Sequence, residues 1–164
     1  MTGNMTLCTV LGTLKQRPDA VAKVRGSSAY PDLCGCVYFY QMNCGVLVAA
    51  QVTGLPKATT DNPHKVFGFH IHSGTDCRGN EKDPFADALT HYNPKELPHP
   101  HHAGDLPPLF GNHGDAFQVV FTDRFTVCEI IHKTVIIHSG PDDFTSQPGG
   151  NAGEKIACGE ICQA

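Results

Sequence analysis

Histidine is concentrated in one part of this chain, and its spacing indicates metal binding. Ten of the 164 residues are histidine, and eight of these lie between His64 and His113. Imidazole nitrogens are frequent ligands of zinc and copper. We therefore interpret this cluster as a metal site before we consider it as core packing.

The motif His70-Ile-His72 lies in an apolar segment that is typical of a strand. Residues two apart on a strand point to the same face, so both imidazoles would lie together while Phe69 and Ile71 face the other way. Taken alone, this spacing is more often a solvent-facing pair than a metal clamp. The interpretation as a clamp depends on the other histidines.

A second group offers three imidazoles and one carboxylate: His91, His99, His102 and Asp105. This donor set suits four-coordinate zinc with no open position, which is typical of a structural site. A polar surface loop stiffened by proline is the alternative. His138 follows the apolar run 135–137, so it would emerge at the rim of a core strand. Alone, it would more often be a hydrogen-bonded structural histidine.

The elements that must position these residues are short strands. The chain has 17 Gly, 12 Pro and no Trp, and only 17% of its residues are charged, which favours strands and turns over long helices. Two loops, 73–114 and 140–153, separate the strand-like segments, and the first contains most of the potential ligands. A helical turn is expected after Asp83-Pro84. The strands are predicted at 21–25, 35–42, 46–53, 66–72, 116–122, 127–131, 134–138 and 155–162.

Together these features predict an all-β, single-domain antiparallel Greek-key β-sandwich or flattened barrel with two long functional loops. The net charge of −4, without a lysine or arginine cluster, argues against nucleic acid or a membrane surface as a partner. We find no apolar run of the ~20 residues that a membrane span requires. No secretory signal is recognisable at the start of the chain. We therefore expect a cytoplasmic protein, or an extracytoplasmic one if the chain is a trimmed form.

Five ordered segments of the chain resemble the copper/zinc superoxide dismutase family. The resemblance extends over roughly residues 20–162, so residues 20–164 are expected to form one domain of this kind. Residues 1–19 would be an N-terminal extension, either a short helix, an edge element or an assembly contact. The segments are Gly68–His72, His91–Pro94, His102–Leu106, Ile130–His138 with Asp142-Asp143, and Gly150–Gly159.

The resemblance implies a ligand set for each metal. It assigns copper to His70, His72, His91 and His138, and zinc to His91, His99, His102 and Asp105. His91 would bridge the two metals, and Asp142 would accept hydrogen bonds from His70 and His99. Cys77 and Cys158 match the disulfide of the family.

The resemblance also implies an activity. Two superoxide anions and protons would become oxygen and hydrogen peroxide by Cu(II)/Cu(I) cycling, with His91 and Lys155 as the catalytic residues. The family usually has arginine where this chain has Lys155, which keeps the charge but loses the planar fork. A solvated surface lysine is the alternative. His99 and His102 are also closer in sequence than is usual, so His101 or His113 could replace an assigned zinc ligand.

Two other functions fit the same residues: a noncatalytic copper-binding or metal-delivery domain on this fold, and a zinc-stabilised structural module. The resemblance suggests a homodimer and a copper donor protein as partners. The remaining cysteines could be buried apolar residues, idle exposed thiols, extra bridges or soft Cu(I) ligands. These are Cys8, Cys34, Cys36, Cys44, Cys128 and Cys162.

Overall fold

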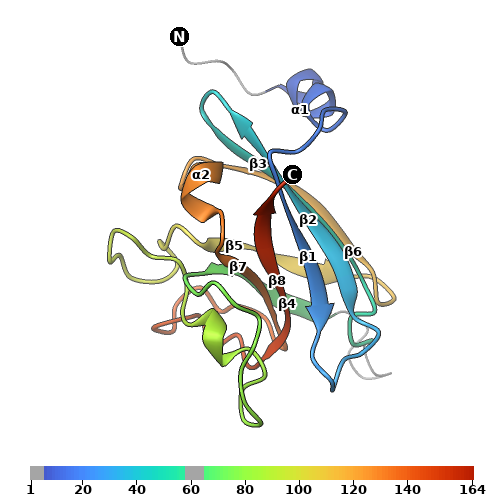
Figure 1. Ribbon diagram of the computed structural model, residues 1–164, viewed down its shortest axis with the longest axis vertical. Coiled ribbons are helices and arrows are strands. Elements are labelled where there is room, and N and C mark those ends of the chain that lie inside the picture. Colours follow the sequence, from blue (N-terminus) through green and yellow to red (C-terminus); the bar gives the residue numbers. More distant parts are fainter. Residues whose placement is uncertain (1–5, 58–64) are drawn as a thin grey trace.

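The computed structural model describes residues 6–57 and 65–164, and it confirms the all-β prediction (Figure 1). In these residues eight strands form one antiparallel sheet in the order β5-β4-β7-β8-β1-β2-β3-β6. The edge strands β5 and β6 contact each other and nearly close the barrel. The strands are β1 (Ala20–Gly26), β2 (Cys34–Met42), β3 (Gly45–Thr53), β4 (Lys65–His72), β5 (Asp105–Gly111), β6 (Ala116–Thr122), β7 (Thr134–His138) and β8 (Lys155–Gln163).

Alternating burial along the strands builds the core of the barrel. On β1, Ala20, Ala22 and Val24 are buried, whereas the residues between them are partly or fully exposed. Strand β4 differs because its last six residues are all buried. Its Phe67, Phe69 and Ile71 belong to the core cluster, and the opposite face carries His70 and His72. The histidine face is therefore covered by something other than the core.

Two long loops lie beside β4, β7 and β8 on one side of the barrel (Figure 1). The first follows β4 and contains the short 3-10 helix η1 (Ala86–Ala88), as the sequence predicts for the region after Asp83-Pro84. The second connects β7 to β8. A backbone bridge places His91 beside His72, and Tyr92 donates its N–H to the carbonyl of Ile71 at 2.8 Å. Backbone pairing thus attaches the first loop to the end of β4.

Two sequence predictions about elements are wrong. The predicted strand 127–131 is instead helix α2 (Val127–Ile130). Glu129 accepts a hydrogen bond from the Thr126 N–H at 2.7 Å, and this local capping interaction favours a helical turn over an extended segment. Strand β5 lies within the predicted loop 73–114. Its Pro107 and Pro108 argue against a central strand, but β5 is an edge strand with an irregular register, where proline is tolerated.

Helix α1 (Leu7–Thr13) lies in the predicted N-terminal extension, of which residues 1–5 are outside the described residues. Its Val10 packs with Leu14 against a small outer cluster that includes Tyr40 and Leu47, so the helix covers part of the outer face of β2 and β3. His64, a member of the histidine cluster to which no ligand role is assigned, also lies outside the described residues. Among residues 6–57 and 65–164, no helix has the length and apolar character that a membrane crossing requires.

Cys77 and Cys158 form the expected disulfide, which joins residues 81 positions apart. Cys77 lies in the first long loop and Cys158 in β8, where it packs with Phe85, Ala88 and Ile136. The bond therefore fastens the first loop to the sheet. The other six cysteines are free thiols, five of them exposed and Cys36 partly exposed. Extra bridges and full burial are thus wrong for these residues.

Replacing Cys77 with serine tests this attachment. We expect the free energy of unfolding of the metal-free protein to fall by roughly 2–4 kcal/mol, because a bond across a long loop restricts the unfolded chain. Denaturant unfolding followed by circular dichroism measures the change. Cys44→Ser is the control, since Cys44 is exposed beyond β2, and its effect should stay within about 0.5 kcal/mol. Equal stability of the two variants would contradict the attachment.

Candidate metal centre

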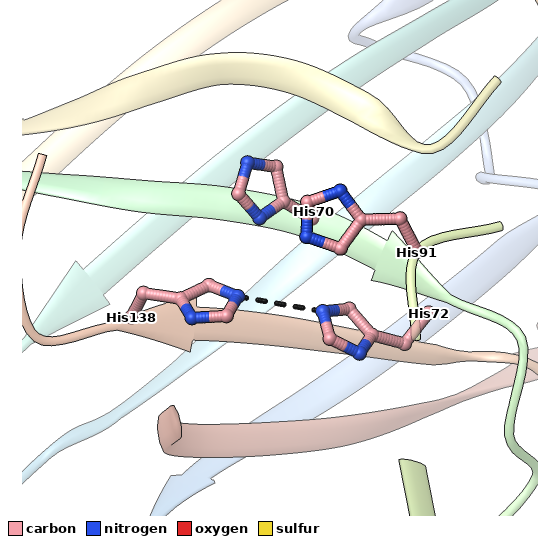
Figure 2. A group of neighbouring side chains, drawn as sticks. All are labelled: His70, His72, His91 and His138. Atoms are coloured by element: carbon pink, nitrogen blue, oxygen red, sulfur yellow. Dashed lines mark hydrogen bonds between the residues drawn. The ribbon is translucent and has the colours of Figure 1, made fainter. Parts of the chain in front are cut away.

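The structure brings the predicted metal ligands into two adjoining groups. In each group, one nitrogen or oxygen from every member lies within 4.8 Å of those from the others. The first group is His70 and His72 of β4, His91 of the first loop and His138 of β7 (Figure 2). The second is His91, His99, His102 and Asp105. His91 belongs to both.

The first group presents free nitrogen lone pairs to one another. His72 Nδ1 lies 2.9 Å from the Leu89 carbonyl oxygen, and His138 Nδ1 lies 3.1 Å from the Gly153 carbonyl oxygen. Because a carbonyl only accepts, each Nδ1 carries the proton and each Nε2 is an acceptor. The two Nε2 atoms are 3.4 Å apart, the contact drawn in Figure 2. Two facing acceptors repel each other, and a cation between them removes this repulsion. Imidazole nitrogens arranged in this way suit copper as the cation.

The second group surrounds the carboxylate of Asp105. Its Oδ1 lies 2.7 Å from His91 Nδ1 and 3.3 Å from His102 Nδ1, and its Oδ2 lies 3.1 Å from His99 Nδ1. Three Nδ1 atoms and one carboxylate are a donor set that fits tetrahedral zinc. His91 directs Nδ1 into this group, which leaves Nε2 for the first group. Both His99 and His102 thus lie close to Asp105 although only two residues separate them in the sequence.

Asp142 connects the two groups from behind. Its Oδ2 accepts from His70 Nε2 and its Oδ1 from His99 Nε2, each at 2.8 Å. Both rings must therefore be protonated at Nε2 and unprotonated at Nδ1. Both Nδ1 atoms are buried without a hydrogen-bond partner. The Asp105 Oδ2 atom lies 3.1 Å from His99 Nδ1, but two acceptors form no hydrogen bond. Such atoms are costly to bury, and a bound cation in each group would satisfy them.

Gly150 leaves space for the hydrogen bond between Asp142 and His99. A Cβ at this position would lie 2.0 Å from Asp142 Oδ1 and 2.7 Å from His99 Nε2. The residue also has φ of +67°, which glycine adopts without strain. The glycine-rich end of the second loop therefore lets the backbone pass over the Asp142 carboxylate.

Burial favours the neutral form of four imidazoles of the centre. It lowers the pKa of His72 well below the usual 6.5 and that of His138 to about 3, and it lowers the pKa of His70 and His102 as well. Burial opposes ionisation of Asp142, but hydrogen bonds from His70, the Phe144 N–H and His99 hold its pKa below the usual value. These four histidines are thus in the neutral state that metal binding needs.

A cavity of about 780 Å³ opens onto both groups. His72, His91 and His138 reach it from the first group and His102 from the second. Uncharged polar side chains form much of the remaining wall: Asn93, Ser146, Gln147 and Asn151. A small polar molecule could therefore reach the shared His91.

Lys155 lies beside this centre but is paired with another residue. It is opposite His138 across the β7–β8 ladder, and its Nζ donates to Asp83 Oδ2 at 2.7 Å and to the Phe85 carbonyl at 3.0 Å. Its side chain is only 15% exposed, so the alternative of a solvated surface lysine is wrong. The contact with Asp83 was not foreseeable, because the two residues are 72 positions apart.

The remaining histidines of the described chain lie outside the two groups. His101 is exposed although its neighbour His102 is buried, and His113 is exposed in the connection between β5 and β6. Neither replaces an assigned ligand in the second group. The sequence interpretation missed the carbonyls of Leu89 and Gly153, because backbone atoms leave no signal in residue type.

The fold and the two groups define a β-barrel protein with a binuclear metal-ligand centre, and comparisons with known proteins agree. Residues 33–161 match the model of the family described as copper/zinc superoxide dismutase (SODC). Superoxide dismutase [Cu-Zn] 2 of Aquifex aeolicus is 32% identical over 145 residues, which cover 79% of this chain and 80% of that protein. Superoxide dismutase [Cu-Zn] of Legionella pneumophila is 32% identical over 151 residues, covering 87% and 86%.

A solved structure supports the fold. The Cu/Zn superoxide dismutase from Brucella abortus aligns with a TM-score of 0.72 at 24% identity and covers 86% of this chain and 98% of that chain. The chain belongs to the copper/zinc superoxide dismutase family. It is an enzyme with superoxide dismutase activity, and copper and zinc are its cofactors.

The lowered histidine pKa values predict an acid-sensitive metal-free protein. Below pH ~6.5 the unfolded chain binds protons at these histidines, whereas His138 in the folded chain does so only near its pKa of about 3. Acid therefore favours unfolding, and stability should fall by at least roughly 1 kcal/mol per pH unit from pH 6 to 4. Urea unfolding of metal-free protein at several pH values measures this. His138→Gln should reduce the slope, whereas His113→Gln should not; equal slopes would contradict the assignment.

Proposed function

We propose that His70, His72, His91 and His138 hold copper and that His91, His99, His102 and Asp105 hold zinc. The observation that carries this proposal is the orientation of His91. Its Nδ1 lies 2.7 Å from Asp105 in the second group, and its Nε2 is left for the first group and the cavity. One imidazole thus serves both metals through opposite nitrogens.

Copper, when bound, supplies one-electron redox exchange as two superoxide anions and two protons become oxygen and hydrogen peroxide, and zinc does not change oxidation state. The protein contributes fixed, neutral imidazoles. The carbonyls of Leu89 and Gly153 and the carboxylate of Asp142 orient His72, His138 and His70 from behind. Little reorganisation is then required when the substrate reacts.

His91 is the residue we assign to proton handling. Its ring lines the cavity, and its Nδ1 is held on the side of Asp105. The opposite atom, Nε2, would be free to take a proton from water in the cavity only while it does not hold copper, and it would then deliver that proton to the reduced substrate. Asp105 keeps the ring oriented during this exchange, which is the usual contribution of a carboxylate behind a histidine.

Lys155 is the residue we assign to guidance of the superoxide anion. A cation near a cavity raises the local concentration of a small anion. The pairing with Asp83 at 2.7 Å cancels part of this field. We therefore infer that guidance in this chain is weaker than an unpaired cation would give.

The homodimer, the copper donor protein, the cytoplasmic location and the separate role of residues 1–19 stay predictions. The six free thiols are compatible with a reducing compartment. The Cys77–Cys158 disulfide favours an oxidising one. Size-exclusion chromatography with light scattering tests the dimer directly.

His138→Ala tests the copper assignment. We expect loss of superoxide dismutation to less than ~1% of the parent rate, because one of four ligands of the redox metal is removed. Zinc content should stay near one per chain, since His138 is not in the second group. Pulse radiolysis and metal analysis measure the two quantities. His113→Ala is the matched control, and full activity of His138→Ala would contradict the assignment.

Asp83→Asn tests the guidance role of Lys155. The Phe85 N–H donates a hydrogen bond to Asp83 Oδ1 at 3.0 Å, and the amide oxygen of asparagine can accept the same bond. The substitution removes only the negative charge opposite Lys155. We expect kcat/KM to rise at least about twofold at low ionic strength, with a steeper fall as salt is added. Asp123→Asn makes the same change in net charge at an exposed residue. If both variants behaved alike, Lys155 would have no guidance role.

A further inference from the structure

Two side chains outside the ligand set hold the backbone of residues 99–105, which carries three of the four members of the second group. From this arrangement we infer that Gln147 and Arg124 are positioning residues, which keep this segment in its ligand-binding shape before a metal arrives. The inference rests on the zinc assignment proposed above. Neither residue belongs to a ligand group.

Gln147 holds His99 by both of its backbone polar groups. The His99 N–H donates to Gln147 Oε1 at 3.0 Å, and Gln147 Nε2 donates to the His99 carbonyl at 2.8 Å. A side-chain amide that pairs with one residue in both directions fixes its orientation as a β-ladder would. Gln147 belongs to the second long loop and lines the cavity. It therefore attaches the zinc-ligand segment to the cavity wall.

Arg124 holds the same segment from the side of β6 and α2. Its Nη1 donates to the carbonyl oxygens of Pro100 at 3.1 Å, His102 at 3.2 Å and Asp105 at 3.2 Å. Three carbonyls that converge on one point repel one another, and a positive charge at that point offsets the repulsion. The segment must curl for these oxygens to meet. Arg124 thus selects the curled form.

The short ligand spacing explains why such contacts are needed. His99 and His102 are three residues apart, lie outside the strands and must both direct Nδ1 toward Asp105. Backbone pairing with the end of β4 and the first loop reaches only Gly104, which accepts from the Ile71 N–H at 2.9 Å and donates to the Tyr92 carbonyl at 2.8 Å. No strand includes residues 99–103. A segment without regular pairing loses conformational freedom when it binds a metal unless other contacts have already ordered it. Gln147 and Arg124 supply those contacts from opposite ends of the segment.

The contacts of Arg124 are confined to the zinc half. The three carbonyls belong to residues 100, 102 and 105, whereas His70, His72 and His138 of the copper half lie on β4 and β7. Loss of Arg124 should therefore weaken zinc binding selectively. A general effect on folding would weaken both metals or neither.

The first experiment titrates the full-length metal-free protein with Zn²⁺ against a competing chelator. We expect Arg124→Gln to lower zinc affinity by roughly 10–100-fold, as outer contacts of metal ligands commonly do. Copper affinity should change less than about threefold on the same scale. Arg25→Gln is the control for charge, since Arg25 is an exposed arginine on β1. Arg124→Lys should recover part of the affinity, because an ammonium can donate three hydrogen bonds.

The second experiment uses Co²⁺ as a spectroscopic probe of the zinc half. Its visible absorption is intense in a tetrahedral site and weak in an octahedral one. We expect Arg124→Gln and Gln147→Glu to reduce this absorption at saturating Co²⁺, whereas Gln51→Glu, at an exposed position of β3, should not. In Gln147→Glu the Nε2 donor to His99 is lost. The double variant should lose less zinc affinity than the sum of the single losses, because both residues order one segment.

The outcomes separate this inference from the zinc assignment. Variants with lower unfolding stability but parental zinc affinity and Co²⁺ absorption would overturn the positioning role. Asp105→Ala in the parent chain tests the assignment independently. If Asp105→Ala left zinc affinity unchanged, the proposed zinc site would fail, whatever the variants of Arg124 and Gln147 showed.

Discussion

The carboxylate of Asp142 determines the state of both halves of the centre. One oxygen accepts from His70 and the other from His99, so both rings are protonated at Nε2 and offer Nδ1 as a ligand. This fixes ring orientation as well as tautomer, because each bond is 2.8 Å long and buried. Loss of the carboxylate would leave two buried imidazoles without partners. Two ligand groups thus depend on a single residue of the second loop for the orientation of one ring each.

The barrel strands and the loops hold the metal ligands in place by different means. Strands β4 and β7 pair directly and carry His70, His72 and His138, so the register of one ladder fixes three ligands of the first group. The loops supply His91, His99 and Asp142, and they need attachments of their own. The disulfide fastens the first loop to β8, and the backbone bridge at His91 fastens it to β4. A functional centre on loops is rigid only where such contacts exist.

Periodicity predicted the parts of the molecule in which local pattern and tertiary contacts agree. The alternation around His70 and His72 placed both imidazoles on one face. The family resemblance, rather than periodicity, implied the two ligand sets whose members lie close together in the structure. Strand β5 was missed because Pro107 and Pro108 oppose strand formation unless the strand is at an edge. The helix at Val127–Ile130 was missed because apolar β-branched residues outweighed the cap at Thr126. The Asp83 partner of Lys155 has no local signal at all.

This difference between local and nonlocal determinants separates the two halves of the centre. In the copper half, strand periodicity places His70 and His72 on one face, and the pairing of β4 with β7 brings His138 beside them. Contacts with Leu89, Gly153 and Asp142 then orient the three rings. In the zinc half, the backbone of residues 99–105 is ordered by Gln147 and Arg124, which are distant in sequence. Changes in the β6–α2 connection or in the second loop can therefore alter the zinc half without touching a ligand. Such changes would reach the copper half only through His91, which belongs to both groups, and Asp142, which bonds a histidine of each group.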